Sequence, residues 1–282
     1  MKKQLIVDSG STKADWRVIE NGIQTGQFFT EGYNPFYLTE DEIVDSLRRQ
    51  VPDFDLAGIN NIYFYGAGCS TKEKCSSIRK ALLKIFPAAQ IEVDHDLLGA
   101  ARALLQHSPG FAAILGTGMN SCLYDGKNIT YHIDSLGYEL GDEGSGASIG
   151  RRFLRALFRK EITEQIIDAF YKRYSLSREE IYDALLNKPM PNRFLAQFAA
   201  FIGAHLKDEN IRKLVDDSFE EFFVNVVTKY PGYRNYSFNC VGSVGYYFRE
   251  ILSGKIRKFE MKEGQIVQAP GDLLVKFHTT SF

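Results

Sequence analysis

Residues 5–19 have the sequence Leu5-Ile-Val-Asp-Ser-Gly-Ser-Thr-Lys-Ala-Asp-Trp-Arg-Val-Ile19, in which two apolar runs flank a short polar turn. The apolar runs predict a buried strand on each side of the turn, and Gly10 gives the turn its conformational freedom. Asp8, at the end of the first strand, is a ligand of the type that Mg²⁺ prefers together with phosphate oxygens. The pattern fits an ordinary hairpin with a polar tip equally well, because short glycine-rich patterns often match by chance. The hydroxyl, amide and ammonium donors that a phosphate would find here belong to Ser9, Ser11, Thr12 and Lys13.

A second stretch repeats this form and favours the phosphate-binding interpretation. Residues 111–133 again contain an apolar run, a polar turn with Gly116-Thr117-Gly118, and a second apolar run. Asn21-Gly22 closes the hairpin of the first copy and Asp125-Gly126 that of the second, and both dipeptides suit two-residue hairpin turns with positive φ. The repeat therefore predicts two similar halves, each presenting a phosphate-binding turn, with a polyphosphate held between them.

Composition narrows the class of protein. The chain has 282 residues, enough for two domains, with 34 basic and 35 acidic side chains and a formal net charge of -1. With this balance the chain has no overall positive potential that would attract nucleic acid or an anionic membrane. No apolar run approaches the ~18 residues of a membrane span, and the first residues do not resemble a signal peptide. We expect a soluble, cytoplasmic protein. Its four scattered cysteines do not have the spacing of a zinc or iron-sulfur site.

Strands and helices alternate between residues 62 and 105. Apolar runs predict strands at 62–65 and 91–93, and a capping box of Ser70 and Glu73 predicts the start of a helix that runs to about residue 86. This alternation indicates an α/β domain whose later strands are parallel. Asp94 and Asp96 would then lie at the carboxyl end of a strand, where open α/β sheets bind ligands. One of them could cap the next helix, and the other is a candidate general base. His95 between them is expected to be an ordinary surface or core histidine.

Two later stretches carry further candidate residues. Residues 136–146 contain four glycines and three carboxylates, which favours a substrate or metal loop over a structural one. Residues 238–248 contain a third glycine-rich turn after an apolar run, where Gly242 and Gly245 would let the backbone approach a flat ligand. Between them, residues 160–230 form a helical insertion with helices near 163–173, 178–187, 192–206 and 209–229, and only packing is expected there.

These motifs together resemble the N-acetylglucosamine kinase and BadF/BadG-type ATPase group of the actin-like sugar-kinase superfamily. The resemblance covers almost the whole chain. It implies an α/β fold of two ribonuclease-H-like domains, residues 1–112 and 113–269, with the tail at about 270–282 packing back on the first and the insertion in the second. The motifs are residues 8–13 and 116–121 for the phosphates, 241–245 for adenosine and 137–145 for the sugar.

The resemblance also assigns roles residue by residue. Asp96 matches the catalytic base that takes the proton from the 6-hydroxyl of the sugar. The adenosine motif includes Gly242, Ser243 and Gly245. Two departures from the family pattern are Ser9 and Ser11, where many relatives have glycine, and Met119-Asn-Ser in the second phosphate motif. The positions that match sugar-binding residues are Asn34, Asn120, Ser121, Gly137 and Asp142.

The resulting hypothesis is phosphoryl transfer from Mg·ATP to a hydroxyl of an amino sugar. The sugar stays open among N-acetylglucosamine, N-acetylmuramate, glucosamine and glucose. One alternative is an ATPase that activates a partner enzyme through a bridging iron-sulfur cluster, which the cysteine spacing disfavours. The other is a nucleotide-dependent sugar sensor. No nucleic-acid or membrane partner is expected, and a homodimer is plausible.

Overall fold

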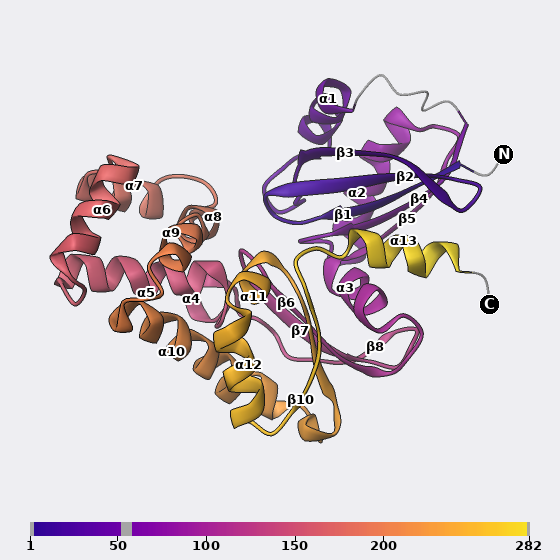
Figure 1. The fold of residues 1–282 in the computed structure, drawn as a ribbon. Coiled ribbons are helices and arrows are strands. Elements are labelled where there is room, and N and C mark those ends of the chain that lie inside the picture. The colour runs from indigo at the N-terminus through magenta and orange to yellow at the C-terminus, as the bar shows by residue number, and fades with distance from the viewer. Residues whose placement is uncertain (1–2, 52–57, 281–282) are drawn as a thin grey trace. The chain divides into compact units, whose positions relative to one another are not determined.

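The computed structural model describes residues 3–51 and 58–280 (Figure 1). The chain divides into two compact units. Unit 1 comprises Met1–Pro109, Tyr124–Thr130 and Ala269–Phe282, and unit 2 comprises Gly110–Leu123 and Tyr131–Gln268. Each unit is built on a five-stranded sheet with helices, the ribonuclease-H-like arrangement of actin-like ATPases. The last two residues of the expected C-terminal tail lie outside the described residues.

The sheet of unit 1 has the strand order β3-β2-β1-β4-β5. Its strands are β1 (Lys3–Ser9), β2 (Lys13–Glu20), β3 (Ile23–Glu31), β4 (Ile59–Gly66) and β5 (Gln90–His95). The first three are antiparallel, with Val7 opposite Trp16, while β1, β4 and β5 are parallel. Asn21 and Gly22 both have positive φ, which confirms the two-residue turn predicted between β2 and β3.

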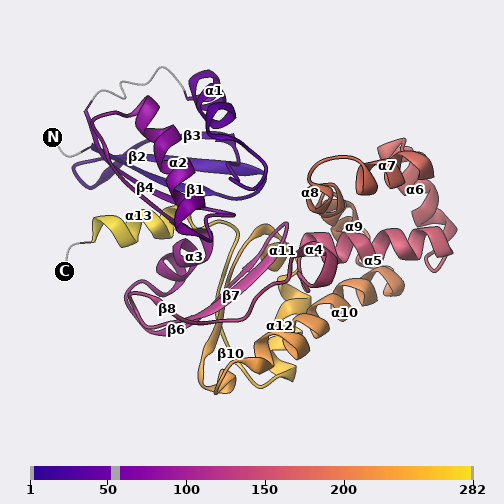
Figure 2. The same ribbon diagram turned by 180° about the vertical axis from the view of Figure 1, so that it is seen from behind.

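Helices cover both faces of this sheet because β1 is apolar on both faces. Leu5 and Val7 pack in the cluster that includes α1 (Glu40–Gln50) and α2 (Lys72–Ile85). Ile6 packs on the other face with α3 (Asp96–Leu105) and α13 (Gly271–Thr279). Figure 2 shows the ribbon with these helices from behind. The helix α2 begins one residue later than predicted. Its N-cap is Thr71, whose side chain accepts from the Lys74 amide, so the predicted Ser70–Glu73 capping box is wrong.

The sheet of unit 2 has the order β10-β9-β6-β7-β8, which repeats the topology of unit 1. Its strands are β6 (Gly110–Leu115), β7 (Met119–Tyr124), β8 (Ile129–His132), β9 (Ser237–Val241) and β10 (Lys262–Val267). As in unit 1, three strands are parallel, here β6, β9 and β10. This repetition confirms the two similar halves predicted from the sequence.

The turn after β7 differs from its counterpart. It spans four residues and is closed by the Asp125 amide, which donates to the Asn128 carbonyl at 3.1 Å. The Asp125 carboxylate accepts from the amides of Lys127 and Asn128. The predicted two-residue turn at Asp125-Gly126 is therefore wrong, because side-chain capping by Asp125 stabilises a longer turn.

The helices of unit 2 enclose an aromatic core. They are α4 (Gly137–Leu140), α5 (Gly146–Arg159), α6 (Glu164–Tyr174), α7 (Arg178–Leu186), α8 (Pro191–Ala196), α9 (Ala199–Ala204), α10 (Glu209–Asn225), α11 (Ser243–Tyr247) and α12 (Arg249–Lys258). The helix expected over 192–206 is two short helices, α8 and α9, and the one expected to reach 229 ends at Asn225. Phe153, Phe170, Phe198 and Phe201 are buried together, so the aromatic residues of the insertion pack in the core, as expected. Across residues 3–51 and 58–280, no helix combines the length and apolarity needed to cross a membrane.

Candidate functional site

The turn between β1 and β2 rests on a glycine from another part of unit 1. Gly10 donates to the Lys13 carbonyl at 3.0 Å, and Gly32 donates to the Thr12 carbonyl at 3.1 Å. A Cβ atom on Gly32 would lie 2.0 Å from the Gly10 carbonyl oxygen, so only glycine fits there. The sequence motifs gave no indication of this approach. The turn and the segment that leads to Asn34 are therefore built as one piece.

The Ser9 hydroxyl ties the same two segments together. Ser9 is fully buried, and its hydroxyl accepts from the Tyr33 amide at 3.0 Å. The contact of Ser9 with phosphate stays a prediction, but the hydrogen bond from the Tyr33 amide shows that its hydroxyl also has a structural role. Thr12 and Lys13 are exposed at the tip of the turn, Ser11 is half-buried, and the Lys13 ammonium lies 4.1 Å from the centroid of the Phe29 ring.

Asp8 has the electrostatic environment of a cation ligand. Burial at the end of β1, together with the nearby charges of Asp96 and Asp15, raises the pKa of Asp8 to about 7 against the opposing effect of Lys13 and Arg17. Neighbouring carboxylates that are poorly compensated attract a cation. Within residues 3–51 and 58–280, no three His, Cys, Asp or Glu side chains gather as a protein metal cluster. Mg²⁺ commonly needs only one or two carboxylates when substrate phosphates and water complete its shell, so the residues present fit this ion.

Asp96 is the first residue of α3, and its neighbour performs the capping. The His95 Nδ1 atom accepts from the Leu97 amide at 3.1 Å, so His95 is the N-cap of α3. His95 therefore has a structural role, and neither Asp94 nor Asp96 is used as the cap. Asp94 instead lies 3.6 Å from the Arg102 guanidinium.

The Asp96 carboxylate has an unused acceptor. Its Oδ1 atom is buried and makes no hydrogen bond within the described residues. His95 Nδ1 is 3.0 Å away, but it already accepts the Leu97 amide and so does not donate to Asp96. An unpaired buried acceptor is costly and often marks a functional site. The Asp96 carboxylate is thus free to accept a hydrogen bond from a ligand hydroxyl.

Asn34 is buried and shapes the loop around it. Its Oδ1 accepts from the Phe36 amide at 3.0 Å, and its carbonyl oxygen accepts from the amides of Tyr37 and Leu38. A Cβ atom on Gly68 would lie 2.2 Å from Asn34 Oδ1, so the loop after β4 must carry glycine there. Asn34 therefore stabilises this turn. It uses the side-chain oxygen and leaves the Nδ2 amide to donate to a ligand.

The turn between β6 and β7 of unit 2 is held by a carboxylate and a helix. Gly116 donates to the Gly118 carbonyl at 3.0 Å. The amides of Gly146 and Ala147, at the start of α5, donate to the carbonyls of Gly116 and Thr117 at 2.8 and 3.0 Å. The Asp142 Oδ1 atom accepts from the Met119 amide at 2.9 Å. The loop of residues 136–146 therefore supports the turn directly.

Asp142 itself is strained and desolvated. It has a φ of 54° and is 6% exposed. Burial raises its pKa to about 6; the Met119 hydrogen bond opposes this, Glu143 adds to it and Arg151 opposes it. Backbone strain and a shifted carboxylate at one position are typical of functional residues. Gly137, at the start of the same loop, has a φ of 67° and open space around its Cα.

The predicted sugar residues on β7 face different surroundings. Asn120 Oδ1 accepts from the Ser121 amide and lies 2.8 Å from His132 Nε2. Ser121 is fully buried, and its hydroxyl lies 2.9 Å from the Tyr230 hydroxyl. The Tyr230 partner was not predicted, since 109 residues separate the two. The contact of Ser121 with a substrate stays a prediction.

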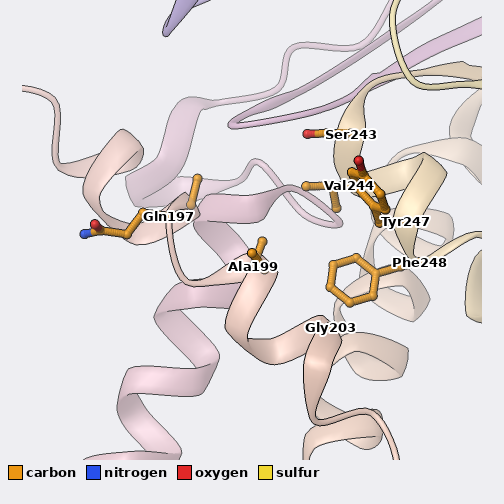
Figure 3. A pocket seen from close by; sticks show the side chains of 9 residues that line it. Gln197, Ala199, Gly203, Ser243, Val244, Tyr247 and Phe248 are labelled. Carbon is orange, nitrogen blue, oxygen red and sulfur yellow. The ribbon is translucent and has the colours of Figure 1, made fainter. Parts of the chain in front are cut away.

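The third glycine-rich turn borders a pocket within unit 2 (Figure 3). The pocket has a volume of about 520 Å³ and lies between α11 and the α8–α9 segment. Figure 3 shows Ser243, Val244, Tyr247 and Phe248 on one side and Ala199 with Gly203 on the other, while the Gln197 amide points away. Its apolar lining and aromatic rings suit a flat ring system. The helical insertion thus contributes more than the packing expected from sequence.

Gly242 and Gly245 have a packing reason inside the protein. A Cβ atom on Gly242 would lie 2.2 Å from the Leu115 carbonyl oxygen, and one on Gly245 would lie 2.7 Å from Cys240 Sγ. These contacts bring α11 against β6 and β9. Close approach to a ligand, the reason given from sequence, is not needed to explain either glycine.

Comparison with known proteins places the chain in a family. No family model and no curated protein matches it. Among solved structures, the "Putative N-acetylglucosamine Kinase" from Porphyromonas gingivalis is 42% identical, with 99% of each chain covered and a TM-score of 0.94. The chain belongs to the N-acetylglucosamine kinase family. The resemblance stated from the sequence motifs is thereby confirmed, and the protein is a sugar kinase by family.

More distant structures share the fold. A "Putative N-acetylglucosamine Kinase" from Chromobacterium violaceum is 16% identical with a TM-score of 0.68, covering 98% of this chain and 99% of its own. A ROK family glucokinase from Streptomyces griseus, solved with glucose and AMPPNP, is 14% identical with a TM-score of 0.61, covering 98% and 97%. At these identities the similarity establishes the two-domain kinase fold alone.

Proposed function

We propose that this kinase transfers the γ-phosphoryl group of ATP to the 6-hydroxyl of an N-acetylated amino sugar such as N-acetylglucosamine. The observation that carries the proposal is the Asp96 carboxylate, which lies at the start of α3 near Asp8 and has an acceptor atom without a hydrogen bond. A carboxylate of this kind can orient a hydroxyl and take its proton. Membership in the N-acetylglucosamine kinase family supports the choice of sugar class.

The nucleotide would be bound by three turns. The donors of residues 9–13 and the turn of residues 116–118 would hold the phosphates, and the apolar pocket beside Ser243 would take the purine ring. The AMPPNP bound to the glucokinase from Streptomyces griseus supports a nucleoside triphosphate as the phosphoryl donor. Magnesium bound at Asp8 would supply positive charge to neutralise the phosphates.

The reaction follows from these positions. Asp96 accepts the hydrogen bond of the sugar hydroxyl and aligns its oxygen for attack on the γ-phosphorus. A new O–P bond forms as the bond between the γ-phosphorus and the bridging oxygen breaks, ADP leaves with that electron pair, and Asp96 receives the hydroxyl proton. Lys13 and the turn amides stabilise negative charge on the transferred group. Such catalysis is mostly positioning and electrostatics.

Recognition of the sugar would come from buried polar groups. The Asn34 Nδ2 amide is a donor left over by the turn around it, and the Asp142 carboxylate has lone pairs beyond the one that accepts the Met119 amide. Gly137, Asn120 and Ser121 are the other proposed contacts. A sugar that lacks a matching hydroxyl leaves one of these buried polar groups without a hydrogen-bond partner, and this strongly weakens its binding. We therefore expect clear discrimination among hexoses.

The test is ADP release with Mg·ATP across N-acetylglucosamine, N-acetylmuramate, glucosamine and glucose. We expect release to depend on an N-acetylated sugar and to fall by a factor of about a hundred or more in Asp96→Asn. The matched control is Asp45→Asn, an exposed carboxylate on α1, which should retain full activity. Release without sugar would indicate a partner-activating ATPase, and no release at all would indicate a sugar sensor. Either result would overturn the kinase proposal.

A further inference from the structure

Unit 1 contains a pocket that the proposed reaction does not use. It has a volume of about 680 Å³ and is lined by the first turns of α2, the end of β5, the start of α3 and the Asn128–Ile129 turn. Its lining residues do not include Asp8, Asn34 or Asp96. The pocket is therefore separate from the proposed catalytic residues of unit 1, although it reaches the residue that precedes Asp96.

The wall formed by α2 is cationic. Lys72, Ser76 and Arg79 line the pocket, and their spacing of four and three residues places them on one face of the helix. Neither cation forms an ion pair within the part of the chain that the structure describes, whereas Lys84 of the same helix is paired with Glu40 at 2.8 Å. The helical rise separates the backbones of Lys72 and Arg79 by about 10 Å, and both side chains are long enough to reach one ligand group beside Ser76. Two uncompensated cations facing one cavity favour an anionic ligand.

The acidic side chains near the pocket already interact with other groups of the protein. Asp94 lines the pocket but lies 3.6 Å from the Arg102 guanidinium, which balances its charge. Glu73 bonds its own amide and the Thr71 hydroxyl, which lowers the pKa of its carboxyl. Glu73 thus serves the start of α2. Neither carboxylate therefore neutralises the positive charges of Lys72 and Arg79, which can pair with an anionic ligand.

The remaining lining is apolar. Ile91, Val93, Leu98 and Ile129 line the pocket together with Cys69 and Cys75. A bare phosphate would leave this surface uncovered, because the pocket is several times larger than the ion. The lining suits a phosphate group carried on a body with an apolar side, and an N-acetylated hexose has one in its methyl group and ring C–H groups.

His95 connects the pocket to the proposed catalytic residue. It lines the pocket, and its Nδ1 atom caps α3 by accepting from the Leu97 amide. Asp96 is the next residue and begins the helix. A ligand that displaces His95 would loosen this cap and move the Asp96 carboxylate.

We propose that this pocket is a second, regulatory site for a sugar phosphate, the product class of the proposed reaction, and that its occupancy lowers turnover through His95. The choice of ligand rests on the proposed function. The binding chemistry, a phosphate monoester between Lys72 and Arg79, does not.

The first experiment measures binding and needs no turnover. Calorimetric titration of the full chain with N-acetylglucosamine 6-phosphate is carried out with the sugar substrate and AMPPNP at saturating concentrations, so that the proposed catalytic site is filled. We expect one equivalent to bind, with affinity at least about tenfold lower in Lys72→Ala/Arg79→Ala, because each charge-assisted contact contributes substantially. The matched control, Arg49→Ala/Lys80→Ala, removes two exposed cations of unit 1 outside the pocket and should bind as the wild type does.

Two outcomes would overturn the site. One is the absence of binding to the wild type, and the other is equal affinity in the pocket variant and its control. Inorganic phosphate is titrated in parallel. Affinity equal to that of the sugar phosphate would overturn the sugar-phosphate assignment and leave a simple phosphate site.

The second experiment measures regulation as a ratio within each protein. Turnover is measured at saturating sugar with and without N-acetylglucosamine 6-phosphate. We expect inhibition that added sugar does not relieve in the wild type and the control, and loss of that component in Lys72→Ala/Arg79→Ala. Inhibition relieved completely by sugar in all proteins would place the ligand in the catalytic site and overturn the regulatory role. An inactive protein that still binds the sugar phosphate would instead count against the proposed function alone.

Discussion

The two halves of this kinase share one strand order, yet they hold their glycine-rich turns by different means. In unit 1 the turn rests on Gly32 and on the Ser9 hydroxyl that accepts the Tyr33 amide. In unit 2 the turn rests on Asp142 and on the first amides of α5. In both halves, however, the support belongs to the segment that carries a proposed sugar contact, Asn34 in one and Asp142 in the other. Similar topology therefore fixes where a turn lies, while local hydrogen bonds and packing join it to the residue proposed to bind the sugar.

The largest effect is expected from Gly32→Ala. The new methyl group would lie 2.0 Å from the Gly10 carbonyl oxygen, and its other near neighbours, Ser11 and Thr12, also meet it with backbone atoms that no side-chain rotation can move. We expect a loss of about 3 kcal/mol or more in the free energy of unfolding and at least about a hundredfold loss in kcat/KM. Urea unfolding followed by circular dichroism and ADP-release kinetics measure the two effects.

Gly116→Ala is the matching change in unit 2. No atom lies within 4 Å of a Cβ atom built on Gly116, so stability should be retained while the KM for ATP rises. A Gly32→Ala protein as stable as the wild type would show that the turn of unit 1 does not depend on this approach.

The carboxylate support of unit 2 is tested by comparing Asp142→Ala with Asp142→Asn. Both remove the charge, but only asparagine keeps an oxygen to accept the Met119 amide. We expect the alanine variant to be less stable by about 1–3 kcal/mol, the cost of a buried amide without a partner. Chemical unfolding at neutral pH measures the difference. Equal stabilities would mean that water replaces the lost oxygen and that the turn is not locked by Asp142.

The pH dependence of Asp142 gives a further contrast. Burial raises its pKa to about 6 from its ordinary value of 3.8, so the folded state binds the proton more tightly than the unfolded state does. Stability should therefore decrease as pH rises from about 4 to about 6, by on the order of 2 kcal/mol. Asp142→Asn should lack this component in unfolding curves measured across that range. A wild-type curve parallel to that of Asp142→Asn would contradict the prediction.

Unit 1 has the opposite response through His278 of α13. Burial, with the Arg102 charge, lowers the pKa of His278 to about 4 from 6.5, and its Nε2 atom lies 2.8 Å from the Tyr65 hydroxyl. The unfolded state then binds the proton more tightly. Stability should decrease as pH falls from about 6.5 to about 4, by on the order of 2 kcal/mol given partial exposure. His278→Gln should remove this dependence, and an unchanged slope in that variant would assign the effect to another group.

The smallest effect is expected from Ser9→Ala. The Tyr33 amide would lose its partner, and we expect a loss of about 1 kcal/mol in the free energy of unfolding. Thr12→Ala is the comparison, because Thr12 is exposed on the same turn and should change the KM for ATP without changing stability. If Ser9→Ala changed only the KM for ATP, the hydroxyl would serve the nucleotide and not the loop.

Local patterns predicted much of this architecture. The strand–turn–strand repeat predicted two similar halves, and the Asn21-Gly22 dipeptide predicted the turn between β2 and β3. Such features depend on residues close in sequence. The approach of Gly32 to Gly10 and the bond between Ser121 and Tyr230 join distant segments, and nothing in either segment alone specifies the partner.

The start of α3 shows a different limit. Aspartate is a common N-cap, so Asp94 and Asp96 were the natural candidates, but the backbone places His95 at the cap position. The pocket beside Ser243 was missed for a related reason. Its walls are alanine, glycine and aromatic residues from the insertion, whose pattern indicates only burial until α8 and α9 are seen to separate.

One buried ring gives this protein a native optical signal. The chain has a single tryptophan, Trp16, which is fully buried on β2 three residues after Lys13. Its ring stacks on Phe28 with centroids 5.4 Å apart, and its Nε1 donates to the Thr30 hydroxyl at 3.0 Å. All indole emission therefore arises from unit 1, and unit 2 is silent at wavelengths that excite tryptophan alone. Changes at the turn between β1 and β2 can therefore be followed by intrinsic tryptophan fluorescence without an added label, and unit 2 contributes no tryptophan background.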